Sequence, residues 1–138
     1  MKQIEYLGCF FDPYVVQSIP VNDRQGPLHR TIAVPHVTFS YNPSEVPGEW
    51  FGATVTVKVV GYGCDGKNEA LLVELVELPQ ALQDLASKIQ TPHITLSVAK
   101  LAKPFDSRYL VFTPIEPYIL TGSFGGMDVE GTIHTEAF

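Results

Sequence analysis

The sequence predicts an α+β fold built mostly from antiparallel sheets, with few helices and with two lobes facing each other across a central cleft. Segments with the two-residue alternation of strands outnumber those with helical periodicity, and they do not form regular β-α-β units. One strand pattern occurs twice, at residues 35–40 and 92–97, which suggests one copy in each lobe. The length of 138 residues fits a single domain spanning residues 1–138.

The N-terminal part of the chain predicts two strands separated by a long loop. Residues 4–11 are rich in β-forming residues and predict the first strand. Residues 12–28 contain prolines and a glycine, so we expect a loop with room for a turn or two of helix at 14–18. The second strand is expected at 31–41, and residues 42–48, which contain two prolines, connect it to the next element.

The clearest hairpin in the sequence lies in the middle of the chain, at residues 51–62 and 69–77. Between these strands stands an Asp65-Gly66 pair, which suits the positive φ angles of a tight turn. Threonines and a lysine alternate with valines between residues 54 and 59, so one face of the first strand is polar.

The segment 79–90 is the one for which we expect a full helix. Its opening proline fits the first helical turn, and apolar residues recur on one face at three- and four-residue intervals: Leu82, Leu85, Ala86 and Ile89. Pro92 ends this helix, and a strand is expected at 93–101. The remaining tail is rich in proline and glycine, and we expect only short strands there, at 109–113, 118–124 and 127–135.

Composition and charge limit the classes of partner. A hydrophobic content of 45% and a charged content of 17% are typical of a packed globular protein. The net charge of −6 disfavours an extended nucleic-acid-binding surface but leaves room for a small nucleotide or an RNA end. Apolar runs are too short to cross a bilayer, and residues 1–6 lack the pattern of a signal peptide. Cys9 and Cys64 are too few for a disulfide scaffold and show no metal-ligand spacing, so we expect a cytoplasmic protein with reduced thiols. We also expect a monomer without a cofactor.

The repeated strand pattern is the main functional signal in this sequence. The two copies read Pro35-His36-Val37-Thr38-Phe39-Ser40 and Pro92-His93-Ile94-Thr95-Leu96-Ser97. Because successive strand side chains point to opposite faces, His, Thr and Ser share one face in each copy. The residues of the opposite face are expected in the core: Phe39, Tyr41, Ile94 and Leu96. A single His-x-Thr triplet is ordinary, but a second copy at the same offsets is hard to explain by chance.

Two histidines and two threonines around one cavity are sufficient for acid–base chemistry on a phosphodiester. Histidine suits both the base and the acid role because its ordinary pKa of about 6.5 allows one ring to be neutral while the other is protonated. The threonine hydroxyls can donate hydrogen bonds to the non-bridging phosphate oxygens, where negative charge accumulates. This chemistry requires no metal ion.

Paired His-apolar-Thr-apolar motifs on strands resemble the signature of the two-histidine (2H) phosphoesterase superfamily. That superfamily includes LigT-like 2′-5′ RNA ligases, 2′,3′-cyclic nucleotide phosphodiesterases, and phage enzymes that cut cyclic-oligonucleotide signals. The resemblance implies a two-lobed fold with a cleft and metal-independent hydrolysis of a 2′,3′-cyclic or 2′-5′ phosphodiester. It also implies that His36 and His93 are the acid–base pair, with His93 the base toward water, and that Thr38 and Thr95 hold the phosphate.

Other residues are candidates for binding the rest of the substrate. Ser40 and Ser97 extend the face that carries His and Thr in each motif. Phe11 and Trp50 are candidates for stacking on a base, a contact worth roughly 1–3 kcal/mol. Lys58 is the candidate cation for the substrate. A Gly-rich segment at 122–126 lacks the lysine of a phosphate-binding loop and predicts a turn.

Two alternatives from other functional classes stay open. The first is a module that binds a nucleotide or an RNA end in the same cleft without turning it over. The second is a metal site formed by His36, His93 and one of His29 or His134, although no carboxylate accompanies these histidines at ligand spacing. The sequence does not separate RNA processing from the destruction of a cyclic-oligonucleotide signal.

Overall fold

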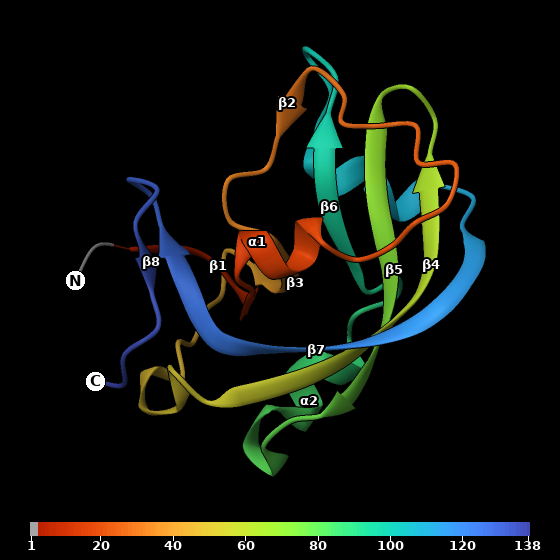
Figure 1. Ribbon diagram of the computed structural model, residues 1–138. Helices are drawn as coiled ribbons and strands as arrows, with labels where there is room; N and C mark the ends of the chain where they lie inside the picture. Colours follow the sequence, from red (N-terminus) through yellow and green to blue (C-terminus); the bar gives the residue numbers. More distant parts are fainter. Residues whose placement is uncertain (1–2) are drawn as a thin grey trace.

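The computed structural model describes residues 3–138, and over these residues the framework is one antiparallel sheet of eight strands (Figure 1). The strands follow the order β2-β6-β5-β4-β7-β1-β3, with β8 paired to β7. In chain order they are β1 (Ile4–Phe10), β2 (Arg30–Thr31), β3 (His36–Tyr41), β4 (Thr54–Cys64), β5 (Asn68–Glu77), β6 (His93–Val98), β7 (Thr113–Asp128) and β8 (Ile133–His134). The predicted α+β class, with a mostly antiparallel sheet and few helices, is confirmed.

The helical elements of the described chain are all short. They are α1 (Pro13–Gln17), α2 (Gln83–Ser87) and the 3₁₀ helices η1 (Gly48–Trp50), η2 (Gln80–Leu82) and η3 (Pro104–Tyr109). The turn of helix expected at 14–18 is confirmed as α1, where Asp12 caps the first turn by accepting a hydrogen bond from the Tyr14 amide. None of the helices in residues 3–138 is long and apolar enough to cross a membrane.

The strand expected at 31–41 is in fact two strands on different partners. β2 pairs with β6, whereas β3 pairs with β1, at the other end of the sheet order. The Ile32 amide still bonds to β6 (Leu96 carbonyl, 3.0 Å), but the Pro35 carbonyl already accepts from Phe11, just after β1 (2.9 Å). Pro35 cannot donate to a ladder because it has no N–H, which explains the break.

This short crossing forces the sheet to curl round. Three residue steps separate Ile32 from Pro35, and even a fully extended chain of that length spans only roughly 10 Å. The two ends of the sheet order, β6 with β2 and β1 with β3, must therefore lie close together. β3 and β6 do contact each other, although no ladder joins them.

β7 is the longest strand and links the two halves of the sheet. Figure 1 shows it as one bent ribbon crossing the whole molecule. Its first part pairs with β4 and its last part with β1. The sequence predicts only short strands in this tail, and that prediction is wrong, because β7 continues through Pro114 and Pro117. Pro117 lies in an irregularity of the β4–β7 ladder, where residues 115–117 have no register partner, and Pro114 lies where β7 has β4 as a partner on one side only. At such positions a missing N–H group is tolerated.

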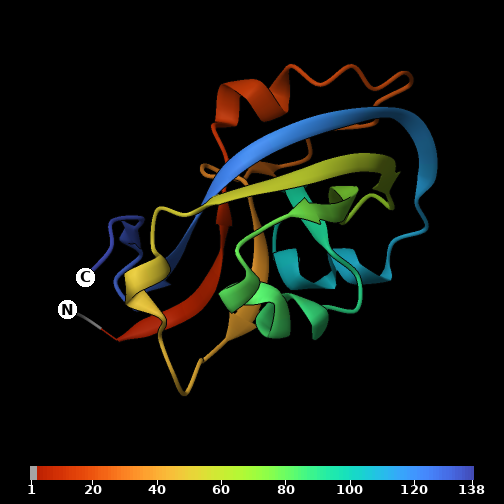
Figure 2. The same cartoon turned by 90° about the horizontal axis from the view of Figure 1, so that it is seen from below.

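The helix expected at 79–90 is also shorter than predicted. It begins as η2 and continues as α2, which ends at Ser87. The predicted apolar stripe is real, since Leu82 and Ala86 are buried in the core and Leu85 and Ile89 pack against it. Residues 104–109, for which no helix was expected, form η3. Figure 2 shows α2 and η3 on the same side of the sheet; α2 contacts β3, and η3 contacts β6.

A buried glutamate fixes the long segment between α1 and β2 against the sheet. Glu69 of β5 is fully buried and accepts two hydrogen bonds from Arg24, at 2.5 and 2.9 Å. Tyr62 and Ser97 donate to the same carboxylate at 2.7 and 2.6 Å. Tyr62 and Ser97 also accept from the backbone amides of Gln25 and Leu28. The Glu69 cluster therefore holds residues 24–28 in place and leads β2 to the edge of β6.

The Glu69 cluster predicts a stability effect with a distinct pH dependence. Burial by itself raises the pKa of Glu69, but the hydrogen bonds from Arg24, Ser97 and Tyr62 outweigh it and hold the pKa below its ordinary value. The charged form thus stabilises the fold above about pH 4.3, and this stabilisation is lost as the pH falls through the lowered pKa. Glu69→Gln should lower the free energy of unfolding by roughly 2–4 kcal/mol at pH 7 and by less at pH 3.5, because the charge begins to lose its advantage below about pH 4.3.

Urea denaturation of the wild type and Glu69→Gln at the two pH values measures this difference. Glu74→Gln is a matched control, because Glu74 lies on the same strand and is exposed. An equal loss of stability at both pH values would contradict the assigned role of the Glu69 charge.

Candidate active site

The two motif strands place their apolar residues in the core and their histidines on the other face, as the alternation predicts. Val37 and Phe39 of β3 are buried in the hydrophobic core, together with Ile94 and Leu96 of β6. His36 and His93 are each half-buried. His36 lies among aromatic rings, whereas His93 lines a cavity.

Tyr41 is the exception to the predicted pattern, since it is 47% exposed rather than buried. The reason is a bulge in the pairing of β1 with β3. Gly8 pairs with Thr38 and Leu7 pairs with Ser40, so Phe39 is one extra residue in β3. A bulge shifts the alternation by one position, which puts Tyr41 opposite Tyr6 on the face that carries His36.

Aromatic rings of β1 hold the His36 imidazole. The ring of Tyr6 stacks on it with the centroids 4.9 Å apart, and the ring of Phe10 lies at 5.7 Å. Between these residues on the same face of β1 stands Gly8, where an added Cβ would come within 2.5 Å of the Val37 carbonyl oxygen. The absence of a side chain at Gly8 thus allows β1 and β3 to approach closely beneath the histidine.

Each motif histidine contacts a backbone carbonyl that lies just before its own strand. The Nδ1 atom of His36 lies 3.0 Å from the Val34 carbonyl oxygen, and the Nδ1 atom of His93 lies 2.8 Å from the Thr91 carbonyl oxygen. Both acceptors are two residues before the histidine. A carbonyl only accepts, so Nδ1 carries the proton in both rings. Nε2 is then the basic nitrogen of each ring when the ring is neutral.

A cavity of about 590 Å³ lies where β3, β6 and η3 meet. It is lined from β3 by the stretch 38–41, from the segment before β6 by 88–91, from β6 by His93, and from η3 by Phe105, Arg108 and Tyr109. Thr38 of the first motif and His93 of the second therefore share one cavity. Thr38 makes no hydrogen bond through its hydroxyl to any other described residue, so this donor is available to a ligand.

The electrostatics of this cavity favour an anion although the chain as a whole is acidic. Lys88 and Arg108 line it, and no Asp or Glu of the described residues does. Burial lowers the pKa of His36, and the nearby charge of His93 lowers it further. Burial also lowers the pKa of His93, and the Arg108 charge adds to this effect, while the Thr91 and Pro104 carbonyls oppose it. Both imidazoles are thereby shifted toward their neutral forms in the ligand-free protein.

The structure brings together some of the predicted site residues but not all. Of the residues predicted to bind the remainder of the substrate, Ser40 lines the cavity. Phe11 lies in the hydrophobic core, and Ser97 belongs to the Glu69 cluster. Trp50 is exposed on η1 and Lys58 is half-buried on β4, and neither lines the cavity. The buried Thr95 bonds to η3 rather than lining the cavity.

Sequence reasoning missed the contribution of η3 to this cavity. Arg108 and the exposed aromatic residues Phe105 and Tyr109 come from a segment where no helix was expected. A signal for them was present, because residues 105, 108 and 109 share one face when the chain is helical. The prolines and glycines of the tail concealed that spacing.

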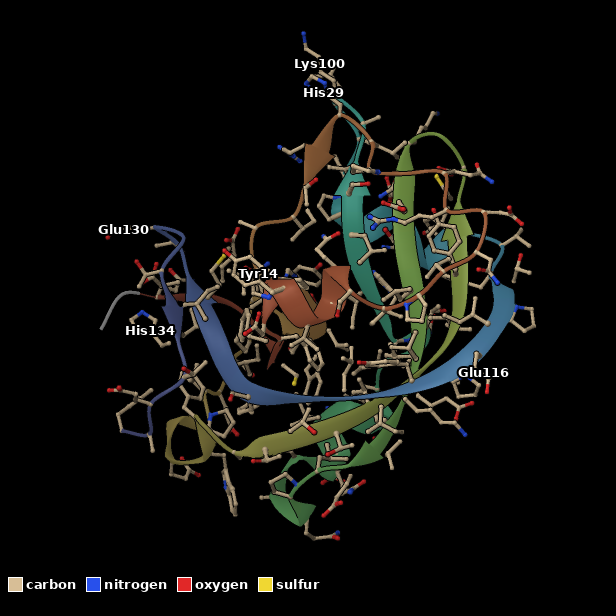
Figure 3. The ribbon with its side chains drawn as sticks, in the orientation of Figure 1. Tyr14, His29, Lys100, Glu116, Glu130 and His134 are labelled. Carbon is tan, nitrogen blue, oxygen red and sulfur yellow. The ribbon has the colours of Figure 1, made fainter. Side chains whose placement is uncertain are left out.

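The residues of the metal-site alternative are dispersed. Among residues 3–138, no three side chains of the His, Cys, Asp or Glu type gather in a way that would hold a metal ion. Figure 3 shows His29 next to Lys100 at one end of the molecule and His134 at its side, by β8. The Nε2 atom of His134 lies 2.8 Å from an Asp128 carboxylate oxygen.

Comparison with known proteins adds no relative to this picture. No protein-family model, no curated protein and no solved structure matches the chain.

The paired carbonyl contacts predict the tautomer of both motif histidines. At pH 7.5, His36 and His93 should carry their proton on Nδ1, and both pKa values should lie below the ordinary 6.5. Long-range ¹H–¹⁵N correlation NMR distinguishes the two ring nitrogens, and His36→Asn and His93→Asn assign the signals. An Nε2-protonated ring at either position would contradict the geometry described above.

Proposed function

We propose that this protein is a metal-independent phosphodiesterase that hydrolyses a cyclic or 2′-5′-linked nucleotide phosphodiester with two histidines as acid and base. The observation that carries the proposal is the meeting of the two motif strands at one cation-lined cavity, with matching backbone contacts on both imidazoles. The resemblance of His36-Val37-Thr38-Phe39 and His93-Ile94-Thr95-Leu96 to the 2H phosphoesterase motif supports the same function.

In the proposed reaction, Nε2 of His93 removes a proton from water, and the water oxygen forms a bond to phosphorus. The bond from phosphorus to the leaving ribose oxygen breaks, and that oxygen takes the proton carried by Nε2 of His36. The two rings end with exchanged protonation states and return to the starting form through solvent. Thr38 donates to a non-bridging oxygen, where charge accumulates in the transition state.

The cavity suits a nucleotide in size and in lining. Its volume lies within the range of roughly 300–1,000 Å³ common for small-molecule sites. The exposed rings of Tyr41, Phe105 and Tyr109 supply surfaces on which a base can stack. The net charge of −6 again favours a small nucleotide, an RNA end or a cyclic oligonucleotide over a long nucleic acid. We expect the protein to act in the cytoplasm as a monomer, without a cofactor.

The alternative function is a binding module that holds the same phosphate without cleaving it. One observation favours it: His36 is stacked under Tyr6 and is not among the residues that line the cavity. A phosphate in this cavity would then have only His93 of the two histidines beside it in this conformation. Calorimetry with a 2′,3′-cyclic nucleotide that binds tightly and is recovered uncleaved would favour this alternative.

The first test is a substrate screen with 2′,3′-cyclic mononucleotides, 2′-5′-linked dinucleotides and cyclic di- and trinucleotides. We expect one class to be cleaved equally well in EDTA. His36→Asn and His93→Asn should each lower kcat by at least about 10²-fold, because each removes one proton-transfer group. Circular dichroism checks that both variants fold.

His29→Asn is the matched control, because His29 is exposed and does not line the cavity. It should retain wild-type turnover. A loss of activity in His29→Asn together with inhibition by EDTA would favour the metal-site alternative instead.

The lowered histidine pKa values predict the pH dependence of catalysis. The productive enzyme carries one neutral and one protonated ring, so kcat/KM should peak between the two pKa values. Since burial lowers both, the peak should lie below about pH 6.5. The kcat profile should lie at higher pH, because a bound phosphate anion favours the protonated rings. A kcat/KM profile with no decline on one side would contradict a two-histidine mechanism.

A further inference from the structure

The second motif threonine has no proton to offer a phosphate. The Thr95 hydroxyl lies 3.0 Å from the Pro104 carbonyl oxygen and 2.9 Å from the Ser107 hydroxyl. A carbonyl only accepts, so the single Thr95 proton is donated to Pro104, and the Ser107 hydroxyl donates to Thr95. Thr95 is also 6% exposed. A non-bridging phosphate oxygen needs a donor, and Thr95 would have to break its bond to Pro104 to become one.

These hydrogen bonds fasten η3 to the sheet. The Asn68 amide of β5 donates to the Lys103 carbonyl at 2.7 Å and to the Ser107 hydroxyl at 3.2 Å. Thr95 holds the same segment at Pro104 and Ser107 from β6. One residue after Ser107 comes Arg108, which points into the cavity that also holds His93. Thr95 thus helps to determine the position of the Arg108 guanidinium.

Arg108 is held in place by its neighbours, and no counter-ion for it is found among residues 3–138. Its guanidinium carbon lies 3.4 Å from the centroid of the Phe105 ring and 4.3 Å from that of Tyr109, and one N–H group donates to the Tyr109 hydroxyl. A second N–H group reaches the Phe105 carbonyl at 3.5 Å. No carboxylate in residues 3–138 pairs with Arg108, whereas the buried Glu69 of the same protein is paired with Arg24. The other donors of its five-donor fork have no protein partner among the described residues.

We propose that Arg108 is the residue that binds the scissile phosphate on the β6 side of the cavity, and that Thr95 is a positioning residue that holds η3 and thereby Arg108. The inference rests on the proposed function for the identity of the phosphate as a nucleotide diester. A guanidinium presents two parallel N–H donors to two oxygens of one phosphate. Thr38 of β3 donates to the phosphate from one side of the cavity, and Arg108 of η3 donates to it from the β6 side.

Arg108 also affects the proton-transfer group next to it. Its charge disfavours protonation of His93, which suits the base role, and a bound phosphate anion neutralises that charge. Removing the guanidinium should therefore raise the His93 pKa in the ligand-free protein. An Arg108 guanidinium that lay away from His93 in solution would leave this pKa unchanged on its removal.

The test compares Arg108→Met with Lys67→Met, using inorganic phosphate as the probe and NMR of the His93 ring as the readout at low salt. Lys67 is exposed, lies outside the cavity, and provides the same loss of one positive charge. Arg108→Met should weaken phosphate binding by about tenfold or more, and Lys67→Met by less than about twofold. The His93 pKa should rise only in Arg108→Met. Equal weakening in the two variants, or an unchanged His93 pKa, would overturn the proposal.

A double-mutant comparison tests the role of Thr95. Thr95→Val should weaken phosphate binding in the wild-type background, and it should add no further loss in Arg108→Met, because it acts through the guanidinium. An equal loss in both backgrounds would show that Thr95 contacts the phosphate itself and would overturn its positioning role. Ser107→Ala, which loosens η3 from the far side of the same network, provides the comparison if Thr95→Val does not fold.

These outcomes are distinguishable from failure of the proposed function. Phosphate binding that depends on Arg108, in a protein that cleaves none of the screened diesters, would support this inference and reject the phosphodiesterase. Diester cleavage that is insensitive to Arg108→Met would support the phosphodiesterase and reject this inference.

Discussion

The crossing between β2 and β3 is the constraint on which the rest of the structure depends. Within three residue steps, the chain leaves a hydrogen bond to β6 at Ile32 and makes one to the residue after β1 at Pro35. So short a link keeps the two ends of the sheet order together, although no ladder connects β3 to β6. The cavity lies in the opening left between these strands. The Glu69 cluster supports this arrangement, because it holds the segment that leads into β2.

The two motif histidines stand in different surroundings despite their matching sequence. His36 lies against Tyr6 and Phe10, while His93 lines the cavity next to Arg108. The proposed acid–base roles would draw on this difference, because the surroundings of each ring set its pKa. The matching feature is the carbonyl two residues earlier, which fixes the tautomer of each ring.

The polar residues around η3 connect the fold to the site. Buried hydroxyl and amide groups need partners, and Asn68, Thr95 and Ser107 satisfy one another and the carbonyls of η3. As a result a short 3₁₀ helix, which would not be stable alone, presents Arg108, Phe105 and Tyr109 at fixed positions. Arg108 contacts aromatic rings and no carboxylate of the described residues, so its positive charge is not neutralised by another side chain. The acidic surface of the protein and its cation-lined cavity are therefore compatible.

Local sequence determined the first strand, the central hairpin, the strand of the second motif, the α1 turn and the presence of two His-x-Thr motifs, because these depend on side-chain periodicity and on proline and glycine geometry. Tertiary structure alone decided the rest. The unpaired edge and the irregular pairing of β7 allow its prolines, the extra residue at Phe39 turns Tyr41 to the other face, and the packing of η3 against β6 brings Arg108 into the cavity that His93 lines. Each of these depends on which strand lies next to which, and neighbours that are distant in sequence leave no periodic signal in either segment.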